Sequence, residues 1–164
     1  MKRPLCLFAA ATLLFAVSVT AQSRNNRGGA AVEFQQYDGS YFERNDSGLT
    51  GEKSFLVLTD QGQFDRIFGA AATMGRNDFL PPDTFATKII VATIKRGGFR
   101  EYSDVKVTAK GRDLLVSYNA KDSEPGSATY STPLILSVSK GKYRSVVFVE
   151  NGKRVGTVKL GRKV

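Results

Sequence analysis

The sequence contains no histidine, and its one cysteine, Cys6, lies in an apolar run at the N-terminus. Without histidine, the chain lacks the base of Ser-His and Cys-His nucleophile systems. Without a further cysteine, it has no disulfide framework and no Cys or His metal site. We therefore expect no cofactor and no metal. A domain of about 140 residues can bury enough surface to fold without disulfides.

The first 21 residues have the features of a secretory signal peptide. Met1, Lys2 and Arg3 form a basic start, Leu5 to Val19 form the apolar run, and Val19-Thr20-Ala21 has the small residues of a cleavage site. The run is about 15 residues long, whereas a membrane-spanning helix needs about 20. We expect cleavage near Ala21, a secreted or periplasmic protein, and no membrane span in the mature form. Cleavage would lower the net charge from +9 to +7.

Residues 22–31 are polar and glycine-rich, which predicts a flexible lead-in, and residues 32–164 then form one domain. Asp38-Gly39 predicts a hairpin turn early in this domain. Asp60 and Gln63 have the spacing of a helix capping box, and an apolar stripe follows, so we expect an amphipathic helix over residues 61–71. The stretch MGRNDFLPPDTF ends this helix, because Pro81-Pro82 forbids helix.

The rest of the chain has the patterns of β-strands. The stretches SFLVLT and KIIVATIK are strands, and the second is apolar on both faces, which is typical of a central strand. Alternation places Leu114, Val116 and Tyr118 on one buried face. Asn151-Gly152 predicts a tight hairpin near the C-terminus. The fold class is therefore mainly β (α+β): an antiparallel β-sandwich or open barrel of about 7–8 strands with one amphipathic helix.

The stretch TIKRGGFREY, residues 93–102, is the strongest candidate for a binding site. We read it as a hairpin in which Gly97 and Gly98 supply positive φ between solvated charged flanks. At an exposed turn, Phe99 gains no free energy from burial unless its side chain packs back on the sheet or contacts another molecule. The candidate partner-binding residues share this loop: Arg96, Gly97, Gly98, Phe99, Arg100 and Tyr102. The loop over residues 122–127 is a second candidate.

The order of these segments resembles the C-terminal domain of the protease-complex subunit PrcB family. The match covers about residues 54–150: the helix begun by TDQGQFDRIF, a proline-rich link, KIIVATIK, a glycine pair with an aromatic, and PLILSVSK. Gly97 and Gly98 match the family's glycines and Phe99 its aromatic, whereas Lys95-Arg96 stand where the family has Pro-Thr. The resemblance implies an accessory envelope protein that associates with a secreted protease. It implies no catalytic residue.

Three functions remain open from the sequence. The first is a non-enzymatic secreted or periplasmic module that binds a protein partner through loops of a β scaffold. The second is a binder of anionic surfaces or glycans that uses the positive charge, with Lys159, Arg162 and Lys163 as a cluster. The third is a small hydrolase that uses carboxylates, either Glu101 with Asp104 or Asp122 with Glu124. Nucleic acid is not expected, because the cations are spread along the chain.

Overall fold

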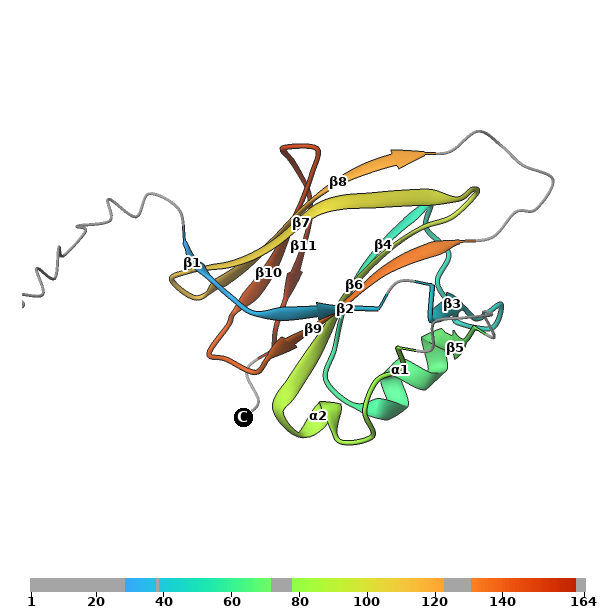
Figure 1. Ribbon diagram of the computed structural model, residues 1–164, viewed down its shortest axis with the longest axis horizontal. Coiled ribbons are helices and arrows are strands. Elements are labelled where there is room, and N and C mark those ends of the chain that lie inside the picture. The colour runs from blue at the N-terminus through green and yellow to red at the C-terminus, as the bar shows by residue number, and fades with distance from the viewer. Residues whose placement is uncertain (1–28, 38, 72–77, 123–130, 162–164) are drawn as a thin grey trace, which may run out of the picture.

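The computed structural model describes residues 29–37, 39–71, 78–122 and 131–161 (Figure 1). These residues form three sheets, with the strand orders β1-β7-β8-β10-β11, β2-β9-β6-β4 and β3-β5. The elements are β1 (Ala30–Ala31), β2 (Phe34–Gln36), β3 (Tyr41–Glu43), β4 (Lys53–Leu58), α1 (Gln61–Ile67), β5 (Phe68–Ala70), α2 (Thr84–Thr87), β6 (Lys88–Lys95), β7 (Arg100–Lys110), β8 (Asp113–Asp122), β9 (Thr132–Ser139), β10 (Ser145–Glu150) and β11 (Lys153–Lys159).

The five-stranded and four-stranded sheets pack face to face, and α1 covers the other face of the four-stranded sheet (Figure 1). The first core lies between the two sheets and includes Leu114, Val116 and Phe148 from one sheet and Leu134 and Leu136 from the other. The second core lies between the four-stranded sheet and α1. Strand β6 is buried on both faces, as the continuous apolar run predicts. The prediction of a mainly β sandwich with a helix against one side is confirmed.

The helix begins where the capping pattern places it. Asp60 Oδ1 accepts a hydrogen bond from Gln63 N at 2.9 Å, and Phe64 and Ile67 are buried. The predicted end at Ala71 is wrong, because Phe68–Ala70 form β5, which pairs with β3. A second, four-residue helix, α2, follows the two prolines.

The hairpin predicted around Asp38-Gly39 is wrong. Gly39 has the expected positive φ of 67°, and Asp38 lies outside the described residues. The strands on either side do not pair with each other: β2 joins β9, and β3 joins β5. The turn therefore passes the chain from one sheet to another.

The strand pairing differs from the expectation at two places in the five-stranded sheet. Strand β1 lies inside the predicted lead-in and pairs with β7, while residues 22–28 and the signal segment lie outside the described residues. Strand β10 pairs with β8 in parallel, although the other pairs are antiparallel. Between these two strands the chain crosses to the opposite sheet to form β9, so it returns in the direction of β8. The hairpin of β10 and β11 is as predicted, with positive φ at Asn151 and Gly152.

Among the described residues, no helix is both long and apolar enough to cross a membrane.

Candidate functional site

The glycine segment between β6 and β7 is not a hairpin. Strand β6 belongs to the four-stranded sheet and β7 to the five-stranded sheet, so residues 96–99 carry the chain across one end of the sandwich. We call this end the loop end. Gly97 has a φ of 92°, which favours glycine, whereas Gly98 does not have a positive φ and instead forms a parallel bridge with Ser131. The interpretation that both glycines supply positive φ is therefore wrong.

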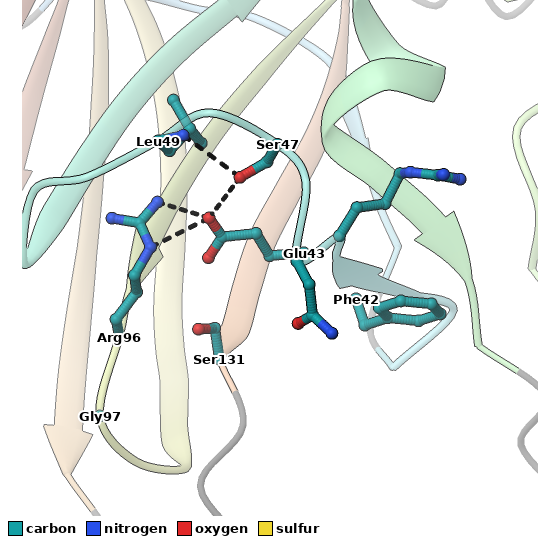
Figure 2. Close-up of a pocket in the computed structure, with 9 residues that line it drawn as sticks. Phe42, Glu43, Ser47, Leu49, Arg96, Gly97 and Ser131 are labelled. Atoms are coloured by element: carbon teal, nitrogen blue, oxygen red, sulfur yellow. Dashed lines mark hydrogen bonds and ion pairs between the residues drawn. The ribbon is translucent and has the colours of Figure 1, made fainter.

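The loop end contains a pocket of about 550 Å³ between β3, the loop that follows it and the start of the glycine segment (Figure 2). Both polar and apolar side chains line it. The residues that line it are Phe42, Glu43, Arg44, Asn45, Ser47, Leu49, Arg96, Gly97 and Ser131. Two predicted site residues, Arg96 and Gly97, are among them.

Glu43 and Arg96 form the fixed wall of this pocket. The Glu43 side chain is 8% exposed, and its Oε1 accepts hydrogen bonds from Arg96 Nε at 3.0 Å and Ser47 Oγ at 2.9 Å (Figure 2). Arg96 Nη1 also donates to the Gly51 carbonyl. A charged pair held by this many hydrogen bonds loses little side-chain freedom on binding. Arg96 is thus a positioned wall residue and not the solvated flank expected from the sequence.

Two phenylalanines are exposed at the loop end. Phe42, on the pocket rim, is 46% exposed, and Phe99, two residues after Gly97, is 39% exposed. The Phe42 ring lies against the backbone of Gly69, where a Cβ would come within 2.6 Å of Phe42 Cζ. The exposed fraction of Phe99 shows that its side chain is neither fully packed against the sheet nor fully solvated. Exposed aromatic side chains on a rigid support are typical anchors of protein interfaces.

Arg100 is buried and Tyr102 is half-buried, and both bond to other parts of the chain. The Arg100 side chain is 6% exposed, and its Nη1 and Nη2 donate to the two carboxylate oxygens of Glu150 at 3.1 and 3.0 Å. Lys53 Nζ lies 2.8 Å from Glu150 Oε1, and Arg100 Nε lies 3.0 Å from Asp122 Oδ1 without hydrogen-bond geometry. This ionic cluster links strands of both sheets. The expectation that Arg100 is a solvated flank of the turn is wrong, because its side chain is buried.

Burial and pairing set the protonation states of the cluster. Burial alone would raise the pKa of Glu150, but the hydrogen bond from Lys53 and the charge of Arg100 outweigh it and lower that pKa. Burial raises the pKa of Tyr102 to about 12, and its hydroxyl donates to the Thr132 carbonyl. Burial also raises the pKa of Tyr118, whose hydroxyl donates to Glu150 Oε2. At neutral pH the carboxylate is ionised and both phenols are protonated donors.

Of the carboxylates considered for hydrolysis, the three that the structure describes are not among the residues that line the pocket. Glu101 and Asp104 are exposed on β7, and Asp104 accepts a hydrogen bond from Asn119. Asp122 pairs with Lys95 and Arg100, and the hydrogen bond from Lys95 is the main cause of its lowered pKa. Glu124, with the rest of the loop over residues 123–127, lies outside the described residues. Among the residues that line the pocket, Glu43 is the one carboxylate.

The sequence prediction missed Phe42, Glu43 and Ser47. The stretch YFERNDSG reads as a polar turn region, and nothing local shows that Glu43 lies 53 positions before its arginine partner. One signal was present: Phe42 is an aromatic in a polar stretch, which is the same argument that singled out Phe99.

No protein-family model matches this chain, and neither a curated protein nor a solved structure matches it.

Proposed function

We propose that the protein is a non-enzymatic accessory protein, secreted or periplasmic, that binds a protein partner at the loop end. The observation that carries the proposal is the exposure of two aromatic rings at the loop end: Phe42, which lines the pocket whose wall Glu43 and Arg96 fix, and Phe99, two residues after the pocket-lining Gly97. Aromatic side chains supply large contact areas and lose little conformational entropy when they bind.

The pocket is suited to one side chain or turn of a partner. Its apolar lining residues, Phe42 and Leu49, can contact an inserted apolar group, and Ser131 adds a polar group to the lining. The Glu43 carboxylate and the Arg96 guanidinium are already paired with each other, so burying them in an interface leaves no uncompensated charge. This arrangement favours recognition over acid or base catalysis, which needs a carboxylate free to exchange a proton.

A secreted protease is the partner that we favour. The support for it is the resemblance of residues 54–150 to the PrcB family, in which the glycine pair and the aromatic correspond to Gly97, Gly98 and Phe99. The predicted signal segment supports an encounter outside the cytoplasm.

The experiment is a quantitative capture from the envelope fraction of the producing cell, read by mass spectrometry. The exported form is compared with the double variant Phe42→Ala and Phe99→Ala and with Val155→Ala. Val155 is exposed on β11 and is not among the pocket-lining residues, so it controls for general apolar contacts. We expect one protein, a protease, to be captured by the wild type and by Val155→Ala and to fall at least about tenfold with the double variant. Equal capture by all three forms would refute the proposal.

A further inference from the structure

A cluster of unpaired cations lies at the end of the sandwich opposite the loop end. Five exposed cationic side chains belong to it, and we call them the basic end: Lys110, Arg112, Lys142, Arg144 and Lys159. They come from three places far apart in sequence, namely the turn between β7 and β8, the connection from β9 to β10, and the end of β11. In Figure 1 these three segments lie on the left of the sandwich, away from the glycine segment.

The strand register fixes the spacing of the basic end. Lys110 pairs with Asp113, Asp113 with Ser145, and Ser145 with Lys159, so these residues form one row across four adjacent strands. Strands lie about 4.8 Å apart, which separates Lys110 from Lys159 by about 14 Å along the row. The cations are thus spread over a surface.

Backbone hydrogen bonds hold the next row in place. Arg144 N donates to the Arg112 carbonyl at 2.7 Å, and Leu160 N donates to the Arg144 carbonyl at 2.8 Å. Arg112 Nε lies 3.4 Å from the Lys142 carbonyl and donates to it. The sheet therefore sets the backbone positions from which these charged side chains extend.

The two ends differ in how their charges are compensated. At and near the loop end, Lys53, Lys95, Arg96 and Arg100 each form an ion pair with a carboxylate. In the part of the chain that the structure describes, none of the five cations of the basic end forms one. The one carboxylate in their segments, Asp113, accepts a hydrogen bond from Ser145. Uncompensated like charges repel one another, and an anionic surface relieves that repulsion.

We propose that the basic end docks on the surface of an anionic phospholipid bilayer. Cations distributed over two rows and three connections can each face a separate headgroup, whereas one polymer chain would need a groove along which to lie. The large exposed apolar side chains found among the described residues are Phe42, Phe79, Phe99 and Val155, and none belongs to the basic end. The basic end therefore lacks the exposed aromatic rings on which nucleic-acid bases stack.

Docking at this end leaves the loop end free, because the two lie at opposite ends of the sandwich. Binding would be electrostatic and superficial, since no apolar side chain of the basic end is placed for insertion. Each cation near an anionic leaflet contributes roughly a fivefold gain in affinity.

The test is sedimentation of the protein, purified in its exported form, with vesicles of phosphatidylcholine alone or mixed with phosphatidylglycerol. The test variant is Lys110→Gln, Arg144→Gln and Lys159→Gln together. The matched control is Lys106→Gln, Lys121→Gln and Lys153→Gln, which removes the same charge from exposed lysines outside the basic end. The single variants Lys110→Gln and Arg144→Gln keep the test decisive if the triple variant does not fold.

We expect binding to the anionic vesicles only, a steep loss of binding towards 0.15 M salt, where the screening length is about 8 Å, and roughly hundredfold weaker binding by the triple variant. The control should lose less than about fivefold, and each single variant should lose about fivefold. Equal losses in the two triple variants would overturn the proposal, because net charge alone would then explain binding. Absence of vesicle binding would also overturn it, and so would tight binding to soluble polyphosphate without binding to vesicles.

Discussion

Glu150 is the residue on which the ionic cluster depends. Its side chain is buried and forms ion pairs with both Arg100 and Lys53. It also accepts a hydrogen bond from the Tyr118 hydroxyl. Removing one partner of a buried pair costs more than the pair contributes, because the other charge stays buried and unpaired. We predict that Glu150→Gln lowers the free energy of unfolding by about 3 kcal/mol in denaturant titrations. Asp46→Asn, which removes an exposed ion pair with Arg44, should leave stability unchanged. An equal effect of the two variants would contradict this role.

The same residue predicts a dependence of stability on pH. The folded state lowers the pKa of Glu150 below 4.5, its ordinary value, so its contribution to stability is present above pH 4.5 and is lost as the pH falls through the lowered value. The difference in melting temperature between the wild type and Glu150→Gln should therefore be constant near neutral pH and shrink below pH 4.5. A difference that stays constant in acid would contradict the assignment.

Single residues were predictable where local pattern decides their surroundings. Leu114, Val116 and Tyr118 are buried as strand alternation requires. Arg100 was not predictable, because a buried arginine depends on a carboxylate 50 positions away. The pairing of Glu43 with Arg96 was not predictable for the same reason, because the two residues are 53 positions apart in the sequence.

At the scale of elements, Gly156 allows β11 to pack closely against β4. A Cβ at this position would lie 2.5 Å from the ring of Phe55, which packs against Phe148 in the first core. We predict that Gly156→Ala destabilises the protein by about 1–3 kcal/mol, because the ring must move out of a packed core. Gly98→Ala is the control, since nothing lies within 4 Å of its added Cβ and its φ is not positive. Equal stability of the two variants would contradict this packing.

The turn between β10 and β11 requires a left-handed backbone. Asn151 and Gly152 have φ values of 50° and 76°, and the Asn151 side chain bonds both backbone groups of Ala120. We predict that Gly152→Val costs about 1 kcal/mol or more, because a β-branched residue is strained there. Gly161→Val, in open space beyond the last strand, should have no measurable effect on thermal melting. A neutral Gly152→Val would show that the turn tolerates strain.

Helices and strands were predictable where the apolar pattern and the capping or turn residues that mark their ends lie in the neighbouring sequence. The strands β4, β6 and β8, the start of α1 and the last hairpin follow from apolar patterning, capping and turn residues. The sheet to which each strand belongs did not follow from these signals. The glycine segment has the same composition whether it closes a hairpin, as predicted, or crosses the sandwich, as observed.

At the scale of the whole molecule, the two ends of the sandwich carry different groups of side chains. The ion pairs of Lys95 and Arg96 and the exposed rings of Phe42 and Phe99 lie at the loop end, whereas none of the five cations of the basic end forms an ion pair in the part of the chain that the structure describes. A sequence in which cations are spread along the chain thus gathers some of them on one surface through strand pairing. Such a layout suits a protein that holds a partner at one end while the other end faces an anionic surface.

The most direct measurement of the central claim, that the loop end binds a protein, uses Phe99→Ala alone. The free energy of unfolding and the affinity for the captured partner are measured on the same preparation. Because the ring is 39% exposed, we predict a loss of stability of at most about 1 kcal/mol, far below the 3–5 kcal/mol of a fully buried phenylalanine, and at least about tenfold weaker binding. A stability loss of about 3 kcal/mol with unchanged affinity would contradict the claim and make Phe99 a packing residue.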